Sequence, residues 1–206
     1  MGAAVDCELI GLGLLGQPVN ALSSLALVVA GLVVLHRDRW VAIALAASGV
    51  GSFLFHGPLA PGGEWIHDVT LAWLILMVGL KSRRWERRFG AFGLAAIAPI
   101  FYVAPAITDP LTVVLVVVTL SLLVFDSRRF DTLGPLALLA VSAIVGRLGS
   151  TGGPWCDPES VLQTHALWHV GAAVAVGWWA IGHAARNQGG VPSAPSSVSG
   201  SDAEQS

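Results

Sequence analysis

Two histidines spaced four residues apart are the strongest chemical signal in the sequence. His165 and His169 stand in the segment THALWHV, and side chains at positions i and i+4 of a helix project from one face, about 5–6 Å apart. That spacing suits two imidazoles on one metal ion, as in the HExxH zinc hydrolases. The three residues between them are apolar, so a third ligand and a base must come from other segments.

A segment near residue 50 adds a third histidine. His56 ends the motif GSFLFH, and Ser52 stands one helical turn before it on the same face. Asp68, in WIHDVTLAWL, is the carboxylate nearest to this level of the predicted helices. Three histidines and a water form a catalytic zinc arrangement, because the pKa of a water in the open fourth position falls to about 7.

Each of these residues also has a structural interpretation. A histidine in an apolar helix is usually a hydrogen-bonded packing residue, and Ser52 could donate to its own helix backbone. His67 precedes Asp68 and faces about 100° away from it on a helix. We therefore interpret His67 as an interfacial residue rather than a ligand.

The elements that would hold these residues are transmembrane helices. The chain of 206 residues is 54% apolar and 12% charged, and blocks such as LTVVLVVVTLSLLVF have no polar face. A bilayer core needs about 20 apolar residues per helix. This predicts an all-α membrane bundle with seven spans: Pro18–Leu35, Trp40–Leu59, Ile66–Leu80, Phe89–Ala106, Leu111–Phe125, Leu133–Leu148 and Leu162–Ile181.

The loop charges predict the orientation of these spans. Ten of the eleven basic residues follow spans 1, 3, 5 and 7, namely Arg37, Arg39, Lys81, Arg83, Arg84, Arg87, Arg88, Arg128, Arg129 and Arg186. The positive-inside rule then places the N-terminus outside and the C-terminus in the cytoplasm. Ser52, Asp68 and the three histidines all fall near the outer end, and Asn20 and Ser23 lie in the outer half of the first span. Such convergence of costly polar groups in a membrane favours a functional site.

The remaining segments are short. We divide the chain into a transmembrane domain, 1–186, and a Pro/Ser/Gly-rich cytoplasmic tail, 187–206, that we expect to be disordered. Cys7 and Cys156 both fall on the outer side, where an oxidising environment permits a disulfide. The net charge is −2 without a basic patch, so no nucleic-acid partner is expected, and no feature sets an oligomeric state.

The pattern resembles the alkaline ceramidase family, within the membrane hydrolase superfamily that includes the adiponectin and progestin receptors. The resemblance rests on CE followed by QPVNALSSL, on GSFLFH, on the Asp in WIHDVTLAWL and on HALWH. These four motifs extend over almost the whole predicted seven-helix region.

The resemblance implies a zinc ion held by His56, His165 and His169, with Ser52 and Asp68 assisting a zinc-activated water. It also implies hydrolysis of the acyl-amide bond of ceramide, a membrane lipid. The family's cysteine pair matches Cys7 and Cys156 in position.

The chain departs from the family in its N-terminal segment. Eukaryotic members bind calcium through an acidic segment there, of which Glu8 remains, while Gln17 replaces an expected carboxylate. Calcium dependence is therefore not expected, and Glu8, Asn20 and Ser23 become candidates for polar contacts. The segment between His56 and Asp68 is also one residue longer. The excess of Arg over Lys indicates a bacterial plasma membrane, where the exact lipid is open.

The sequence thus predicts a zinc-dependent intramembrane hydrolase that cleaves the acyl-amide bond of a ceramide-like lipid. The alternative is a receptor-like or structural seven-helix zinc protein without hydrolysis. A transporter is a third hypothesis, but transporters place ionisable groups such as His and Asp at the membrane midplane, between repeats. Here the polar groups gather at one end and no repeat is visible.

Overall fold

A computed structural model describes residues 3–81, 86–125 and 130–189, and the regular elements of this part of the chain are all helices. The all-α prediction is confirmed. The elements are η1 (Ala3–Asp6), α1 (Pro18–Val34), α2 (Arg39–His56), α3 (Gly63–Leu80), α4 (Glu86–Val103), η2 (Pro105–Ile107), α5 (Thr108–Val124), α6 (Phe130–Leu148) and α7 (Thr164–Gly189).

Several helix ends differ from the predicted bounds by three residues or more, including both ends of α4 and the starts of α5 and α6. The ends of α2, α3 and α7 show the local reasons or the size of the difference. Helix α2 ends at His56 and not at Leu59, directly before the Gly57–Pro58 step. Helix α3 begins at Gly63, because Gly62 adopts a left-handed φ of 77° as its N-cap. Helix α7 continues to Gly189, three residues into the segment expected to be disordered. The rest of that segment, 190–206, lies outside the described residues.

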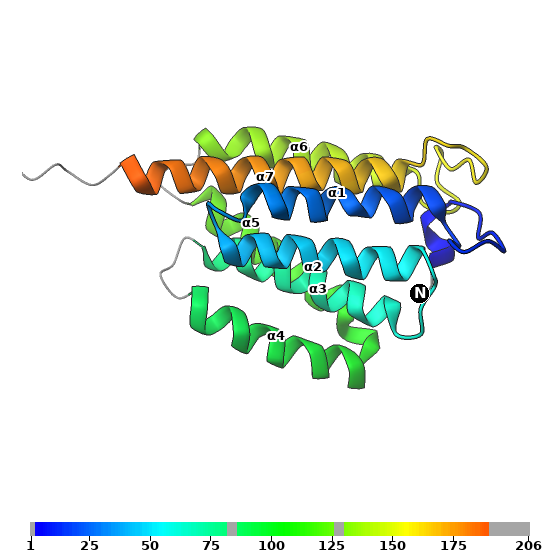
Figure 1. Ribbon diagram of the computed structural model, residues 1–206, viewed down its shortest axis with the longest axis horizontal. Coiled ribbons are helices and arrows are strands. Elements are labelled where there is room, and N and C mark those ends of the chain that lie inside the picture. Colours follow the sequence, from blue (N-terminus) through cyan, green and yellow to red (C-terminus); the bar gives the residue numbers. More distant parts are fainter. Residues whose placement is uncertain (1–2, 82–85, 126–129, 190–206) are drawn as a thin grey trace, which may run out of the picture.

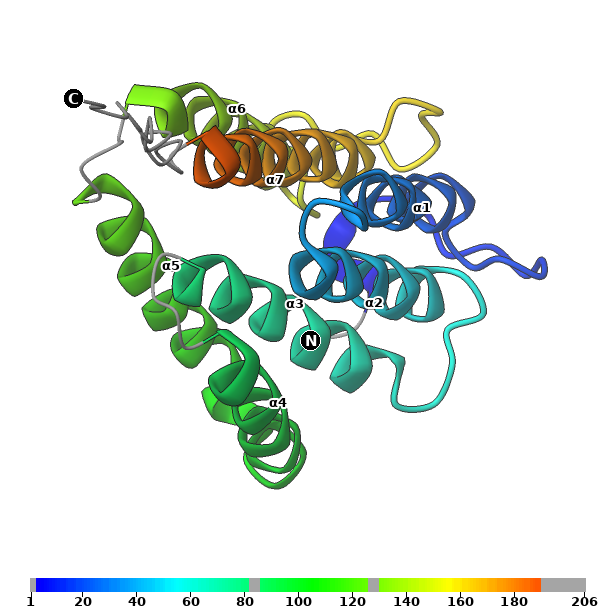
Figure 2. The same cartoon turned by 60° about the vertical axis from the view of Figure 1, so that its left-hand side comes forward.

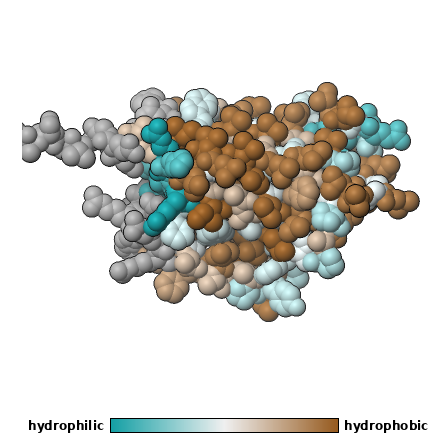
Figure 3. Space-filling model, in the orientation of Figure 1, coloured by the Kyte–Doolittle hydropathy of each residue, from teal (hydrophilic) through white to brown (hydrophobic). Residues whose placement is uncertain are grey.

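Three stretches are long and apolar enough to cross a membrane: α2, α3 and Pro105–Val124, which joins η2 to α5. Shorter apolar stretches lie at Pro18–Val34, Phe89–Val103 and Thr132–Leu148. The outer faces are apolar as well; for example, Val113 and Val117 of α5 are 61% and 57% exposed. In Figure 3 apolar residues cover the middle of the visible face, and hydrophilic residues lie towards its ends. A surface of this kind is compatible with a membrane protein.

The helices run side by side along the long axis (Figure 1), and α1 lies between the two helices that carry the candidate ligands. It packs on α2 and on α7, whereas α6 packs along α7, and α3 packs on α2, α4 and α5. Figure 2 shows the same neighbours from a second direction. The segment before α1, the α2–α3 loop and the α6–α7 loop lie at the same end, which we call the disulfide end because the Cys7–Cys156 disulfide is there.

Small residues let α1 and α2 approach closely. A Cβ atom on Gly49 would lie 2.7 Å from Val28 Cγ2 and 2.9 Å from the backbone oxygen of Ser24. A Cβ atom on Gly31 would lie 2.7 Å from the backbone oxygen of Ala42. Small residues at helix crossings are typical of membrane bundles, because they bring the two backbones into van der Waals contact.

We therefore expect Gly49→Ala to destabilise the protein by about 1–3 kcal/mol, because the added methyl group meets backbone atoms that cannot move aside. Thermal unfolding in detergent would measure the change. Gly11→Ala is the matched control, since the nearest atom to its new Cβ is 3.7 Å away. Equal melting temperatures for wild type and Gly49→Ala would contradict the close packing of α1 and α2.

Candidate metal centre

The three predicted ligands come together at the disulfide end. His56 lies in the last turn of α2, and His165 and His169 lie in the first turns of α7. One ligand atom from each lies within 4.8 Å of the others. The ring centroid of His56 is 5.0 Å from that of His165 and 5.4 Å from that of His169, and the two α7 rings are 4.6 Å apart. The three histidines could bind a metal ion.

Gln17 fixes the tautomer of His56. The amide nitrogen of Gln17 donates to the backbone oxygens of Ala3 and Glu8, both at 2.8 Å, which sets the orientation of the amide. The Oε1 atom of Gln17 then accepts from the Nδ1–H of His56 at 2.7 Å. The proton of His56 is thus on Nδ1, and its buried Nε2, which has no hydrogen-bond partner, carries a free lone pair.

Asp6 has the same effect on His165. Its Oδ1 atom lies 3.2 Å from Nδ1 of His165, and its Oδ2 atom lies 4.0 Å from Nδ1 of His56. A carboxylate accepts the Nδ1 proton and leaves Nε2 unprotonated, and Nε2 of His165 is also buried without a partner. Burial raises the pKa of the Asp6 carboxyl to about 6, and the charge of the nearby His67 opposes this shift.

Serine hydroxyls orient His169. Ser23 and Ser24 donate their protons to the backbone oxygen of Asn20, at 2.9 and 2.8 Å. Ser23 Oγ therefore accepts from Nδ1–H of His169 at 2.9 Å. Ser24 Oγ accepts from Ser52 at 2.8 Å, so the Ser52 proton is not directed at Nε2 of His169, 3.1 Å away. The lone pair of this third Nε2 stays available.

The arrangement fits a metal ion. Ligating histidines usually donate their second ring N–H to a protein acceptor, which fixes the tautomer and the ring orientation. All three histidines meet this condition through different partners. Buried nitrogens without a partner are unfavourable, and a shared metal ion would satisfy those of His56 and His165 together.

The segment before α1 is held in place by a disulfide and by a helix cap. Cys7 and Cys156 are joined, with their Cα atoms 5.6 Å apart, which links this segment to the α6–α7 loop. Glu8 accepts from the backbone N–H groups of Val19 and Asn20, each at 2.8 Å, and so caps the N-terminus of α1. Asp6 is thereby held between the disulfide and His165.

The structure turns His67, and not Asp68, towards the histidine cluster. The ring of His67 stacks on Phe55 at 5.2 Å and lies 6.2 Å from that of His56. His67 is not a member of the three-histidine group, and its ring lies beside that group. Asp68 accepts from Nδ1 of His67 at 3.1 Å.

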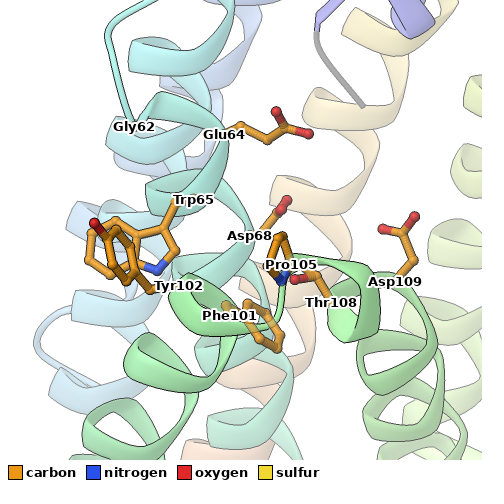
Figure 4. Close-up of a pocket in the computed structure, with 9 residues that line it drawn as sticks. All are labelled: Gly62, Glu64, Trp65, Asp68, Phe101, Tyr102, Pro105, Thr108 and Asp109. Atoms are coloured by element: carbon orange, nitrogen blue, oxygen red, sulfur yellow. The ribbon is translucent and has the colours of Figure 1, made fainter.

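Asp68 also lines a pocket of about 370 Å³ between α3, α4, η2 and α5 (Figure 4). Glu64 and Asp109 are the other carboxylates of this pocket, and Trp65 and Tyr102 form an aromatic wall. Asp68 is connected to the three histidines through His67, which it contacts and whose ring lies beside that of His56.

Sequence reasoning missed Gln17 and Asp6 as functional residues. In the sequence Gln17 stands out only as a departure from a family pattern, yet it is fully buried and its side chain contacts His56. Its partner is 39 positions away, and no local spacing rule signals such a contact. One sequence signal could have indicated Gln17 and Asp6. Both precede the first predicted span on the predicted outer side, which is also the side of the histidines.

No family model, curated protein or solved structure matches this chain. What the site could bind is therefore judged from its own geometry. That geometry consists of three imidazoles with fixed tautomers, two of them with unpartnered buried nitrogens, and a ring of orienting side chains around them.

Proposed function

We propose that the protein is a zinc-dependent membrane hydrolase of the alkaline ceramidase type, which cleaves the acyl-amide bond of a ceramide-like lipid. One observation carries the proposal: the ligand atoms of His56, His165 and His169 lie within 4.8 Å of one another. Structural zinc sites use four protein ligands, whereas three histidines leave a coordination position open for reactants. The group in the described part of the chain has three members.

The membrane topology belongs to the same proposal. We assign all seven α-helices as spans of a bacterial plasma membrane, with the disulfide end outside. The Cys7–Cys156 disulfide supports the outward orientation of this end, because disulfides persist in oxidising compartments. Arg37 and Lys81, which the positive-inside rule places in the cytoplasm, follow α1 and α3 at the opposite end.

A bound zinc ion would supply Lewis acidity towards an acyl carbonyl and towards water. The protein's own groups supply orientation and proton transfer. Gln17, Asp6 and Ser23 hold the three imidazoles in the ligating tautomer. Gln17 also donates to two backbone oxygens of the N-terminal segment.

We assign proton transfer to the pair His67 and Asp68. Asp68 accepts the Nδ1 proton of His67, so Nε2 of His67 can take up a proton next to the cluster. The carboxylate plays the orienting part that an aspartate plays in a catalytic triad. The resemblance assigns the aspartate to the reaction directly; in this arrangement it acts through its neighbour.

Asp68→Asn is expected to keep the metal and to lower kcat by about 10²–10⁴-fold, because an amide can stabilise the wrong tautomer of His67. Metal content and turnover would be measured on the same preparation. Asp109→Asn, in the same pocket but without a contact to His67 among the described residues, is the matched control. Normal turnover of Asp68→Asn would remove the pair from the mechanism.

The function itself is tested by metal analysis followed by a lipid screen. The purified protein is expected to contain one zinc ion, to release a fatty acid from N-acyl lipids, to lose this activity with a chelator and to regain it with added zinc. Fatty-acid ester lipids in the same screen separate amide from ester preference. Stoichiometric zinc without turnover on any acylated lipid would instead support the receptor-like or structural alternative.

A further inference from the structure

Buried polar atoms without a hydrogen-bond partner gather at the disulfide end. In the part of the chain that the structure describes they are both amide atoms of Asn20, Nε2 of His56, Nε2 of His165 and Nε1 of Trp40. All but the last belong to α1, α2 and α7 near the metal centre. A metal ion accounts for the two histidine nitrogens and leaves the amide of Asn20 unexplained.

The helix register places Asn20 level with those nitrogens. Ser24 and Ser52 contact each other at 2.8 Å across the antiparallel helices α1 and α2. Asn20 lies one turn from Ser24 on α1, and His56 lies one turn from Ser52 on α2, both towards the disulfide end. Ser24 also lies 3.4 Å from His169 Nδ1, and one turn from His169 towards the same end is His165. Asn20 therefore faces the level at which these histidine nitrogens meet.

The backbone of Asn20 is fixed on both sides. Its N–H donates to Glu8 at 2.8 Å, and its carbonyl oxygen accepts from Ser23 and Ser24. The side chain, which is 0% exposed, is the part of the residue left to bind something. Burying an amide without a partner is unfavourable, so a ligand that pairs with it recovers that loss.

The side-chain amide of Asn20 has free donors where Ser52 has none. The sequence suggested Ser52 as the group that assists the reaction, but the Ser52 proton is donated to Ser24. The Nδ2 group of Asn20 has two N–H donors, and both are uncommitted. An uncharged donor also suits a buried position, where a lysine or arginine would carry a large desolvation cost.

We propose that the side-chain amide of Asn20 binds the acyl oxygen of the substrate, by donating a hydrogen bond from Nδ2 beside the metal centre. The proposal rests on the proposed function for the class of substrate, an acylated lipid whose product is a fatty acid. A preorganised donor at a developing oxyanion contributes to catalysis because it strengthens as charge forms.

The test uses the full chain in detergent, loaded with zinc, and myristate as a probe of the product class. Asn20→Leu keeps the approximate side-chain volume and removes both polar atoms. We expect it to retain one zinc ion, to bind myristate about 10-fold or more weakly by calorimetry, and to lower kcat by about 10²–10³-fold. Its melting temperature is expected not to fall, since an unpaired buried amide is lost. Asn20→Ala provides the same readouts if the leucine variant does not fold.

Trp40→Phe is the matched control, because it removes the remaining unpartnered atom at the other end of α2 and is expected to leave myristate affinity unchanged. Unchanged myristate affinity in a zinc-replete Asn20→Leu protein would overturn the proposal even if the wild type hydrolyses lipids. Loss of zinc from Asn20→Leu would overturn it too, by making Asn20 a metal-site residue. If the wild type hydrolyses nothing but binds myristate in an Asn20-dependent way, the acyl-oxygen site stands and the hydrolase proposal fails.

Discussion

Replacement of His169 by alanine is expected to abolish metal retention and lipid hydrolysis together. The change removes one of three ligands, and it also breaks the hydrogen bond from α7 to Ser23 on α1. Zinc affinity should fall by more than the 10–100-fold that is typical of changes around the ligands. Turnover should fall by at least about 10³-fold, because the Lewis acid is lost.

His183→Ala is the matched control for this experiment. His183 lies on the same helix, with its ring 5.5 Å from Trp179 and away from the cluster. Metal content by mass spectrometry and hydrolysis by fatty-acid release would be measured on both variants. A His169→Ala protein with full metal content and normal turnover would rule out the three-histidine centre.

Gln17→Met is expected to weaken zinc binding by about 10–100-fold while leaving all three ligands in place. Methionine has a similar volume but cannot accept the Nδ1 proton of His56, so the imidazole loses the partner that fixes its tautomer. Competition with a chromophoric chelator would measure the affinity. Gln17→Glu keeps an acceptor for His56 but loses the donors to Ala3 and Glu8. It should therefore bind zinc within a few-fold of wild type and melt at a lower temperature.

A second buried glutamine serves as a control that separates an effect on zinc affinity from a general loss of stability. Gln163 is 2% exposed, and its amide donates to the backbone oxygens of Asp157 and Ser160 in the α6–α7 loop. Gln163→Met should lower the melting temperature without changing zinc affinity. Equal losses of affinity in both glutamine variants would show that Gln17 acts only through the stability of the disulfide end.

The three histidines could be predicted from the sequence because their signal is local. His165 and His169 lie one turn apart, and His56 lies at the end of an apolar segment, so helix geometry alone gives their approximate level. The helical class followed from apolar blocks with no polar face. Helix ends were less well predicted, since the Gly/Pro-rich segment before α3 gave no sign that Gly62 would start the helix early.

The surroundings of the histidines could not be predicted because they depend on rotation and on long-range contacts. Adjacent residues on a helix face different directions, and the sequence does not show which of His67 and Asp68 turns inward. The contact between Gln17 and His56 and that between Asp6 and His165 both begin in a segment with little regular structure. Such contacts appear only once three helices are placed side by side.

The position of α1 between α2 and α7 has a consequence for biosynthesis. The groups that form the centre come from segments far apart in the chain, at positions 6–23, 56 and 165–169. A nascent chain that has not yet released α7 from the ribosome can present at most one of the three imidazoles. Binding of a metal ion by all three imidazoles would therefore require that α7 has been released and has packed on α1, and a polypeptide truncated before His165 would keep only His56 of the three.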